Sequence, residues 1–172
     1  MTMAKITPAD VESTEAYDPL NCTHTALRVA SRQLTQLYDD ALAASGLTSG
    51  QALLVARIDE MGGAPGGAGP SLQALAKRLS IQISALTHAL RPLVRDGLVD
   101  VVVDGTDRRV KRAVLTEQGL KQTQQMYVLW RELNERIDGV LGAGTTEQLR
   151  GLANLVAAPG FAEKVLSEGG HG

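Results

Sequence analysis

Four basic side chains gather in a short segment near the middle of this chain, directly after a turn signal. They are Arg108, Arg109, Lys111 and Arg112. The turn signal is Asp104-Gly105, and it lies between two runs of mostly β-branched and basic residues, 98–103 and 108–115, which predicts a β-hairpin. Cations on a narrow hairpin can contact the phosphate backbone or the minor groove of duplex DNA. The segment therefore indicates charge recognition rather than bond-making chemistry.

The segment before the hairpin predicts a helix that could bind beside it. Apolar residues recur at helical spacing within 82–96, at Ile83, Leu86, Leu90 and Leu93, and we expect them to face the core. The side chains that remain for the outward face are Gln82, Ser84, Ala85, Thr87, His88 and Arg91. Short polar and basic groups on a helix suit the major groove, where base edges present donors and acceptors. The order of segments predicts a helix-turn-helix followed by a basic wing.

The charge distribution supports a nucleic-acid partner although the whole chain is slightly acidic. The chain carries a formal net charge of −2. Residues 71–116 contain eight basic and four acidic residues, a net charge of +4, whereas the remainder contains nine basic and fifteen acidic residues, a net charge of −6. Such a division would concentrate phosphate attraction on one face. A solvated charged face is the alternative explanation.

Helices that position this unit are expected on its N-terminal side. Spacing predicts a first helix over 20–44, ended by Gly46, and a second over 48–61 with Thr48 as its N-cap. The segment 62–70 contains five glycines and two prolines, which excludes regular structure and predicts a flexible connector. It lacks the spacing of a glycine-rich phosphate cradle.

Further helices are expected around the wing. Ser71 can cap a short helix over 72–79, a long helix begins at Thr116, and a last helix covers 146–157. The outer helices carry more apolar surface than a small core can cover, which indicates a helical dimer interface. The expected organisation is a leader over 1–17, a first dimerisation helix over 18–46, a winged unit over 47–116, C-terminal dimerisation helices over 117–158 and a tail over 159–172.

Composition narrows the function classes. The 172 residues with 44% hydrophobic content suit one compact domain or one completed by a partner. Cys22 is the single cysteine, so an intrachain disulfide framework is excluded and a cytoplasmic location without a membrane partner is expected. No cysteine or histidine cluster has metal-ligand spacing and no nucleophile motif occurs, so we expect neither an enzyme nor a cofactor or metal. The basic segment lacks aromatic residues, which argues against stacking on single-stranded bases.

Four segments together resemble the MarR family of bacterial transcriptional regulators, and the likeness covers about 20–156. The segments are Leu-Ala-Lys-Arg-Leu at 75–79, Leu-Arg-Pro-Leu-Val-Arg-Asp-Gly-Leu-Val at 90–99, Asp-Arg-Arg at 107–109 and Leu-Thr-Glu-Gln-Gly at 115–119. The resemblance implies a mostly α-helical fold with a small β-hairpin wing, in which a winged helix-turn-helix is flanked by dimerisation helices. It also implies a homodimer on pseudo-palindromic operator DNA, with repression as the default outcome.

The resemblance assigns roles within the wing and the recognition helix. It implies that Arg109 contacts the minor groove and that Asp107 positions it, and a carboxylate on the same side of a strand can orient a guanidinium in this way. A plain surface ion pair is the alternative. Ile83 and His88 stand where many family members carry arginine. His88 can therefore be a base contact or a solvated surface side chain.

Two kinds of effector remain open. By resemblance, a small aromatic or phenolic ligand would bind between the dimerisation helices and the winged unit, and the candidate residues are His24, Arg28, Tyr38, Met61 and Trp130. For the last three, packing in the core is the favoured alternative. Cys22 is a candidate redox sensor because a helix N-terminus or His24 could lower its pKa, although an inert thiol is the alternative. A winged-helix module that binds other proteins is a further possibility.

Overall fold

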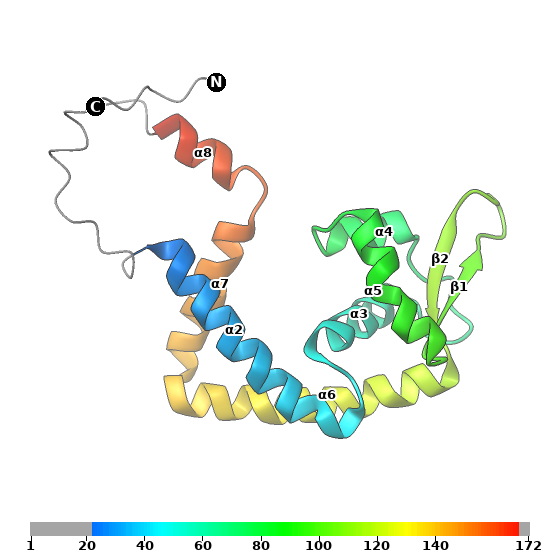
Figure 1. The fold of residues 1–172 in the computed structure, drawn as a ribbon, viewed down its shortest axis with the longest axis horizontal. Coiled ribbons are helices and arrows are strands. Elements are labelled where there is room, and N and C mark those ends of the chain that lie inside the picture. Colours follow the sequence, from blue (N-terminus) through cyan, green and yellow to red (C-terminus); the bar gives the residue numbers. More distant parts are fainter. Residues whose placement is uncertain (1–21, 169–172) are drawn as a thin grey trace, which may run out of the picture. The chain divides into compact units, whose positions relative to one another are not determined.

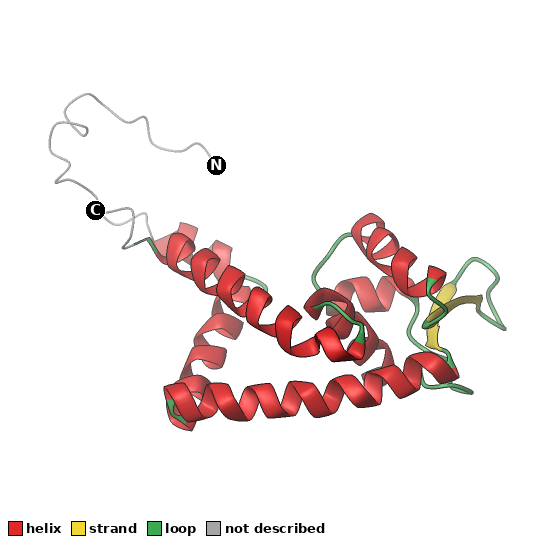
Figure 2. Cartoon of the chain, turned by 60° about the horizontal axis from the view of Figure 1, so that its bottom comes forward, coloured by secondary structure: helices red, strands yellow, loops and turns green. Residues whose placement is uncertain are grey.

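The computed structural model describes residues 22–168, and within this range it is mainly helical with one β-hairpin (Figure 2). The chain divides into two compact units, residues 1–37 and 38–172. Within 22–168, no single helix has both the length and the hydrophobicity to cross a membrane. The segments 23–45 and 49–60, which form a bent pair, have this length and hydrophobicity only when they are taken together, and by length and composition alone.

The first two helices end close to the predicted positions, whereas the predicted start of the first one, at residue 20, lies outside the described residues. α2 covers Thr23–Leu42 and continues into the 3-10 turn η2, Ala43–Ser45. Gly46 then adopts a left-handed φ of 70°, which ends the helix as expected. α3 covers Ser49–Glu60, and Thr48 forms a capping box with Gln51, so its predicted role as N-cap is confirmed.

The helix-turn-helix consists of α4, Leu72–Arg78, and α5, Ile83–Arg95 (Figure 1). The Ser71 hydroxyl accepts a hydrogen bond from the Ala74 amide, which confirms the predicted cap. Ser80 turns the chain between the helices with a φ of 54°. Both helices contribute to a single core of buried side chains: Leu42, Leu47, Ala52, Leu54, Val55, Ile58, Leu75, Ala76, Leu86, Leu90, Leu93, Leu98, Val99, Ala113, Leu115 and Met126.

The glycine-rich segment 62–70 is anchored to the wing, so the expectation of a flexible connector is wrong. It contains no regular helix or strand, as predicted. However, the amide of Leu115 donates to the Gly63 carbonyl at 2.7 Å, and the amide of Ala113 donates to the Pro70 carbonyl at 3.0 Å. A Cβ at Gly69 would lie 2.1 Å from the Ala113 carbonyl oxygen, so only glycine permits this approach. Both ends of the segment therefore pair with the second wing strand.

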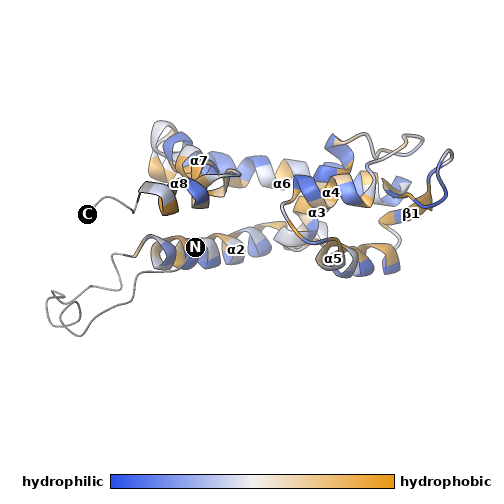
Figure 3. Ribbon diagram, turned by 90° about the horizontal axis from the view of Figure 1, so that it is seen from above, coloured by the Kyte–Doolittle hydropathy of each residue, from blue (hydrophilic) through white to orange (hydrophobic). Residues whose placement is uncertain are grey.

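The wing is an antiparallel pair of β1, Val99–Val103, and β2, Lys111–Leu115, with Val99 opposite Leu115 and Val103 opposite Lys111. The hairpin predicted around Asp104-Gly105 is confirmed, but its second strand begins at Lys111 and not at Arg108. The connection runs from 104 to 110, and the Asp104 amide donates to the Val110 carbonyl at 2.9 Å. β1 itself is mainly hydrophobic, and the tip of the hairpin is hydrophilic (Figure 3).

Three helices follow the wing. α6 covers Glu117–Leu141, and Thr116, where this helix was predicted to begin, is its N-cap. α7 covers Ala143–Ala157 and begins three residues earlier than predicted. α8 covers Phe161–Glu168, a helix within the segment that was expected to be a tail. Large apolar side chains are exposed on α2, on the C-terminal end of α6, on α7 and on α8: Leu27, Val29, Leu34, Leu37, Val140, Leu141, Leu149, Leu152, Leu155, Val156, Val165 and Leu166.

Candidate nucleic-acid interface and ligand cleft

The outward face of α5 has the predicted polar character. Leu86, Leu90 and Leu93 are at most 2% exposed and attach the helix to the core. The predicted DNA-facing residues on the helix itself all lie on its exposed side: Ser84, Ala85, Thr87, His88 and Arg91. Gln82 is exposed too, as the N-cap residue, but its side chain makes no capping hydrogen bond. The helix therefore offers a row of mostly polar side chains to an external partner.

Ile83 was expected in the core, and this expectation is wrong. Its side chain is 45% exposed at the first position of α5. It lines a shallow pocket of about 190 Å³ together with Arg109 and Lys111 of the wing. The buried stripe of the helix begins only at Leu86, because the first turn projects beyond the core.

The loop of the wing is built around the Asp104 carboxylate. It accepts hydrogen bonds from the Thr106 amide at 2.8 Å, from the Asp107 amide at 2.9 Å, and from the hydroxyl of Thr106. The Nε of Arg112 donates to its second oxygen. These donors, Thr106 first and Arg112 next, hold the pKa of Asp104 well below its usual value. Asp104 is therefore charged at neutral pH, and its hydrogen bonds connect the start of the loop to Thr106, Asp107 and Arg112.

Arg109 and Asp107 form the ion pair that the sequence predicts. The Nε and Nη2 atoms of Arg109 lie 3.1 and 3.2 Å from the two carboxylate oxygens, so the pair is bidentate. This pairing lowers the pKa of Asp107. The Arg109 side chain is 91% exposed. Asp107 thus orients an arginine whose outer surface is open to solvent.

The four basic wing residues divide into two groups. Arg108, Arg109 and Lys111 are exposed, and neither Arg108 nor Lys111 forms an ion pair within residues 22–168. Arg112 instead turns inward, where it pairs with Asp104 and donates from Nη1 to the Gly69 carbonyl at 2.7 Å. Arg112 therefore stabilises the wing, and three cations remain for a partner.

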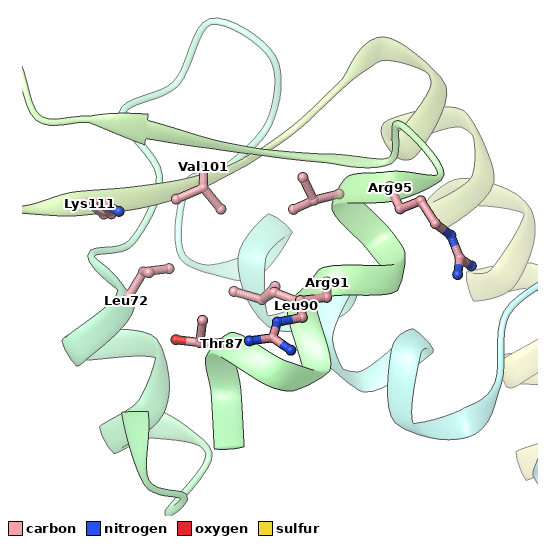
Figure 4. A pocket seen from close by; sticks show the side chains of 8 residues that line it. Leu72, Thr87, Leu90, Arg91, Arg95, Val101 and Lys111 are labelled. Carbon is pink, nitrogen blue, oxygen red and sulfur yellow. The ribbon is translucent and has the colours of Figure 1, made fainter. Parts of the chain in front are cut away.

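A cleft of about 420 Å³ lies between α5 and the wing (Figure 4). Leucine and valine side chains form its walls, and Arg91, Arg95 and Lys111 line it with positive charge. Arg95 is neutralised in part by its pair with Asp96 at 2.8 Å. α5 and the wing are thus separated by a cleft that is mainly apolar and carries three basic side chains.

A second cleft, of about 490 Å³, lies between α3 and α6. Its lining is Leu53, Ala56, Arg57, Glu60, Tyr127, Trp130, Arg131 and Asn134. Tyr127 donates to Asp59 at 3.1 Å, and its partial burial, more than this bond, raises its pKa to about 12. Two arginines beside an indole and a phenol form an environment that suits a small aromatic anion.

A chain of ion pairs leads from this cleft to the helix-turn-helix. One oxygen of Glu60 accepts from Arg57, which lines the cleft, and the other accepts from Nη2 of Arg78 at 3.1 Å. Both arginines lower the pKa of Glu60, Arg57 more strongly. Because Arg78 is the last residue of α4, Glu60 joins the cleft to the helix that packs on α5.

Of the five predicted ligand residues, only Trp130 lines the α3–α6 cleft. Tyr38 does not line the cleft but contacts two residues that do. Its ring packs edge-on against Trp130 with the ring centroids 6.2 Å apart, and its hydroxyl donates to Asn134 at 3.0 Å. Met61 packs against the core. His24 and Arg28 are exposed on α2, and Cys22 is partly buried directly before this helix.

Apart from Trp130, the α6 residues of this cleft were missed from the sequence, although they share one signal. Tyr127, Trp130, Arg131 and Asn134 recur at spacings of three and four, which places them on one face of α6. Tyr127 was interpreted only as an apolar residue of this helix, and Arg131 was not considered. Within residues 22–168, no group of three or more His, Cys, Asp or Glu side chains could hold a metal ion.

Comparisons with known proteins agree with this geometry. The model of the MarR family matches residues 47–111. The DNA complex of the Mycobacterium tuberculosis transcriptional regulator MosR is similar with a TM-score of 0.66 and 35% identity, over 78% of this chain and 93% of that one. A search of curated protein sequences returned no significant match.

Two further structures share the fold at lower identity. Bordetella bronchiseptica BpsR, whose DNA binding is regulated by 6-hydroxynicotinic acid, has a TM-score of 0.72 at 19% identity, over 83% of this chain and 98% of that one. A variant of Escherichia coli MarR complexed with operator DNA has a TM-score of 0.71 at 21% identity, over 84% and 100%.

Proposed function

Since this chain belongs to the MarR family, and is therefore a DNA-binding transcriptional regulator rather than an enzyme, we propose that it acts as a homodimeric repressor in the cytoplasm. On this proposal it binds a specific double-stranded operator and is released by a small aromatic or phenolic ligand. The observation that carries the proposal is the exposed, paired Arg109 beside an α5 whose outward face is polar.

DNA binding would divide between two kinds of contact. The exposed cations Arg108, Arg109 and Lys111 would contact phosphates and the minor groove. The outward side chains of α5 would read the major groove: Gln82, Ser84, Ala85, Thr87, His88 and Arg91. The net charge of +4 on residues 71–116, against −6 on the rest, favours this orientation of the molecule on DNA.

A homodimer would cover the exposed apolar surface of the outer helices. Leu152 and Leu155 on α7 are 63% and 62% exposed, and Leu166 on α8 is 62% exposed. Such a concentration of apolar surface on terminal helices is typical of an interface between protein chains. Two recognition helices related by a two-fold axis would then bind two half-sites.

The α3–α6 cleft is where we place the effector. Arg57 and Arg131 line it and could bind a carboxylate, while Tyr127 and Trp130 could contact an aromatic ring. An anion bound to Arg57 competes with Glu60, which also binds Arg78 of α4. The ligand would thus favour a conformation in which α4 and α5 are displaced. A ligand that bound both conformations equally would not change DNA affinity.

The test is binding of the purified protein to the duplex upstream of its own gene. Fluorescence anisotropy at several salt concentrations, with a scrambled duplex as control, measures both affinity and its ionic part. We expect tighter binding to the upstream duplex and a strong loss with added salt. The variant Arg109→Ala should bind every duplex more weakly, with a salt slope reduced by about one. Equal affinity for the scrambled duplex would contradict the proposal for this site.

A further inference from the structure

The first two turns of α5 present methyl groups where a DNA-reading helix commonly presents charged donors. We infer that this helix reads the 5-methyl groups of thymine in the major groove, with Ile83 as the main contact and Thr87 beside it. The inference rests on the proposed DNA-binding function and specifies which feature of the operator is recognised.

Ile83 supplies the largest apolar surface at the start of the helix. It is 45% exposed, and it lies beside the wing cations Arg109 and Lys111 in one shallow pocket. Those cations suit phosphates, whereas a branched aliphatic side chain cannot bind phosphate or a polar base edge. The thymine methyl is the apolar group that the major-groove edges of the bases offer. Ile83 therefore matches a methyl rather than a donor or acceptor.

Thr87 presents its methyl group for a separate reason. Its hydroxyl donates to the Ile83 carbonyl at 2.8 Å, one turn earlier in the same helix. The donor is thus occupied, and the exposed side chain offers its γ-methyl on the same flank as Ile83. Ala85, also exposed, adds a further methyl group.

The basic side chains that commonly recognise guanine are absent from the first two turns of α5. Residues 83–90 contain neither arginine nor lysine, and Arg91 is the first cation on the helix. Bidentate recognition of guanine by arginine, the commonest specific contact, is therefore not available to these two turns. Apolar contact therefore adds to the discrimination that the neutral polar side chains Gln82, Ser84 and His88 can provide there.

The experiment compares operators that differ only in single methyl groups. A preferred duplex is first selected from random-sequence DNA with the purified full-length protein. Each thymidine of one half-site, and its symmetry mate, is then replaced by deoxyuridine, which removes the 5-methyl and leaves every hydrogen bond. We expect about a three- to fivefold loss of affinity at one or two thymidines, the effect of removing one apolar contact. Replacement elsewhere should have little effect.

Two variants assign the contact. Ile83→Ala should bind the selected duplex more weakly and should no longer distinguish thymidine from deoxyuridine at the sensitive position. Its salt slope should equal that of the wild type, since no charge is removed. Ile81→Ala is the matched control: Ile81 is 39% exposed but lines a different groove, between α3 and α5, so this variant should retain full sensitivity. Thermal melting of both variants verifies that they fold.

The outcomes separate the two proposals. If the wild type selects no sequence from random DNA, the proposed function itself fails. If it selects a sequence yet tolerates every deoxyuridine, or if Ile83→Ala keeps the sensitivity of the wild type, DNA binding stands and methyl reading by Ile83 is overturned.

Discussion

Arg109 and Arg112 lie three residues apart in the wing, each paired with an aspartate, but they differ in what they leave exposed. Arg109 is 91% exposed and its aspartate only orients it. Arg112 is 31% exposed, its partner Asp104 only 11%, and it also binds the Gly69 carbonyl. The same residue type is thus left exposed to solvent at one position and stabilises the fold at the other.

Replacement of Arg112 should therefore affect stability before it affects DNA contact. We expect Arg112→Met to lower the melting temperature by several degrees, because Asp104 loses a charged donor and the glycine-rich segment loses an anchor. Lys111→Met should leave the melting temperature nearly unchanged and weaken DNA binding. Calorimetry measures the melting temperatures of both variants, and anisotropy measures their DNA binding. The opposite pattern, with a larger loss of stability in Lys111→Met, would contradict the different roles of the two residues.

The Asp104 carboxylate should make wing stability depend on acid pH. Its pKa lies below the ordinary value of 3.8, so its stabilising contribution is complete above about pH 4 and is lost as the pH falls through the lower, folded value. The melting temperature of the wild type should exceed that of Asp104→Asn at pH 7, and the gap should narrow below about pH 4. A gap that stays constant down to pH 2.5 would show that the carboxylate charge has no role.

At the scale of elements, local signals predicted most of the fold. Thr48, Ser71 and Thr116 each cap the helix that follows, because the side-chain oxygen of a serine or threonine satisfies a free amide regardless of distant contacts. The hydrophobic spacing of α5 likewise identified Leu86, Leu90 and Leu93 as core residues.

Elements that depend on distant partners were not predictable. Ile83 follows the apolar period of α5 but lies beyond the end of the core. The glycine-rich segment is fixed by hydrogen bonds to β2, some fifty residues away, and no local pattern encodes these bonds. The inward turn of Arg112 depends on the same long-range contact with Gly69. Apart from Trp130, the residues of the α3–α6 cleft were missed because they come from two separate helices, which no local pattern brings together.

Two glycines of α6 offer a direct test of packing between this helix and the wing. A Cβ at Gly119 would lie 1.9 Å from the Leu98 carbonyl oxygen, whereas a Cβ at Gly139 would meet no atom within 4 Å. We expect Gly119→Ala to destabilise the protein by about 1–3 kcal/mol, the usual range for overpacking. Gly139→Ala should stabilise it by about 0.5–1 kcal/mol through helix propensity. Urea unfolding measures both, and equal effects would contradict the close approach.

The Glu60 bridge between cleft and helix-turn-helix should be measurable without a ligand. Glu60→Gln removes the charge that binds both Arg57 and Arg78, so α4 loses a restraint. We expect operator affinity to fall by up to about fivefold, consistent with exposed ion pairs. In an Arg78→Met background the same replacement should have a much smaller effect. Additive losses in the double variant would show that the two residues are not coupled.

At the scale of the whole molecule, apolar surface is concentrated on the outer helices, and its burial should depend on a second chain. Leu152→Glu places a charge on a side chain that is 63% exposed in the single chain. We expect this variant to shift sedimentation from dimer toward monomer and to weaken operator binding. Gln148→Glu adds the same charge at a polar position of α7 and should leave the dimer intact. A fully dimeric Leu152→Glu would exclude this side chain from the interface.

The glycine-rich segment has a mechanical consequence for signalling. It starts directly after α3, whose residues line the cleft proposed for the effector, and both of its ends are hydrogen-bonded to the second wing strand. Because hydrogen bonds hold both ends of this segment, we expect it to pass a displacement of α3 on to the wing. A movement of α3 would therefore displace the wing as well as α4. Binding of one ligand would then weaken the proposed minor-groove and major-groove contacts together. Lengthening the glycine-rich segment by a few residues at its exposed middle, 66–68, should leave the wing and the cleft folded. It should make the position of the wing independent of α3.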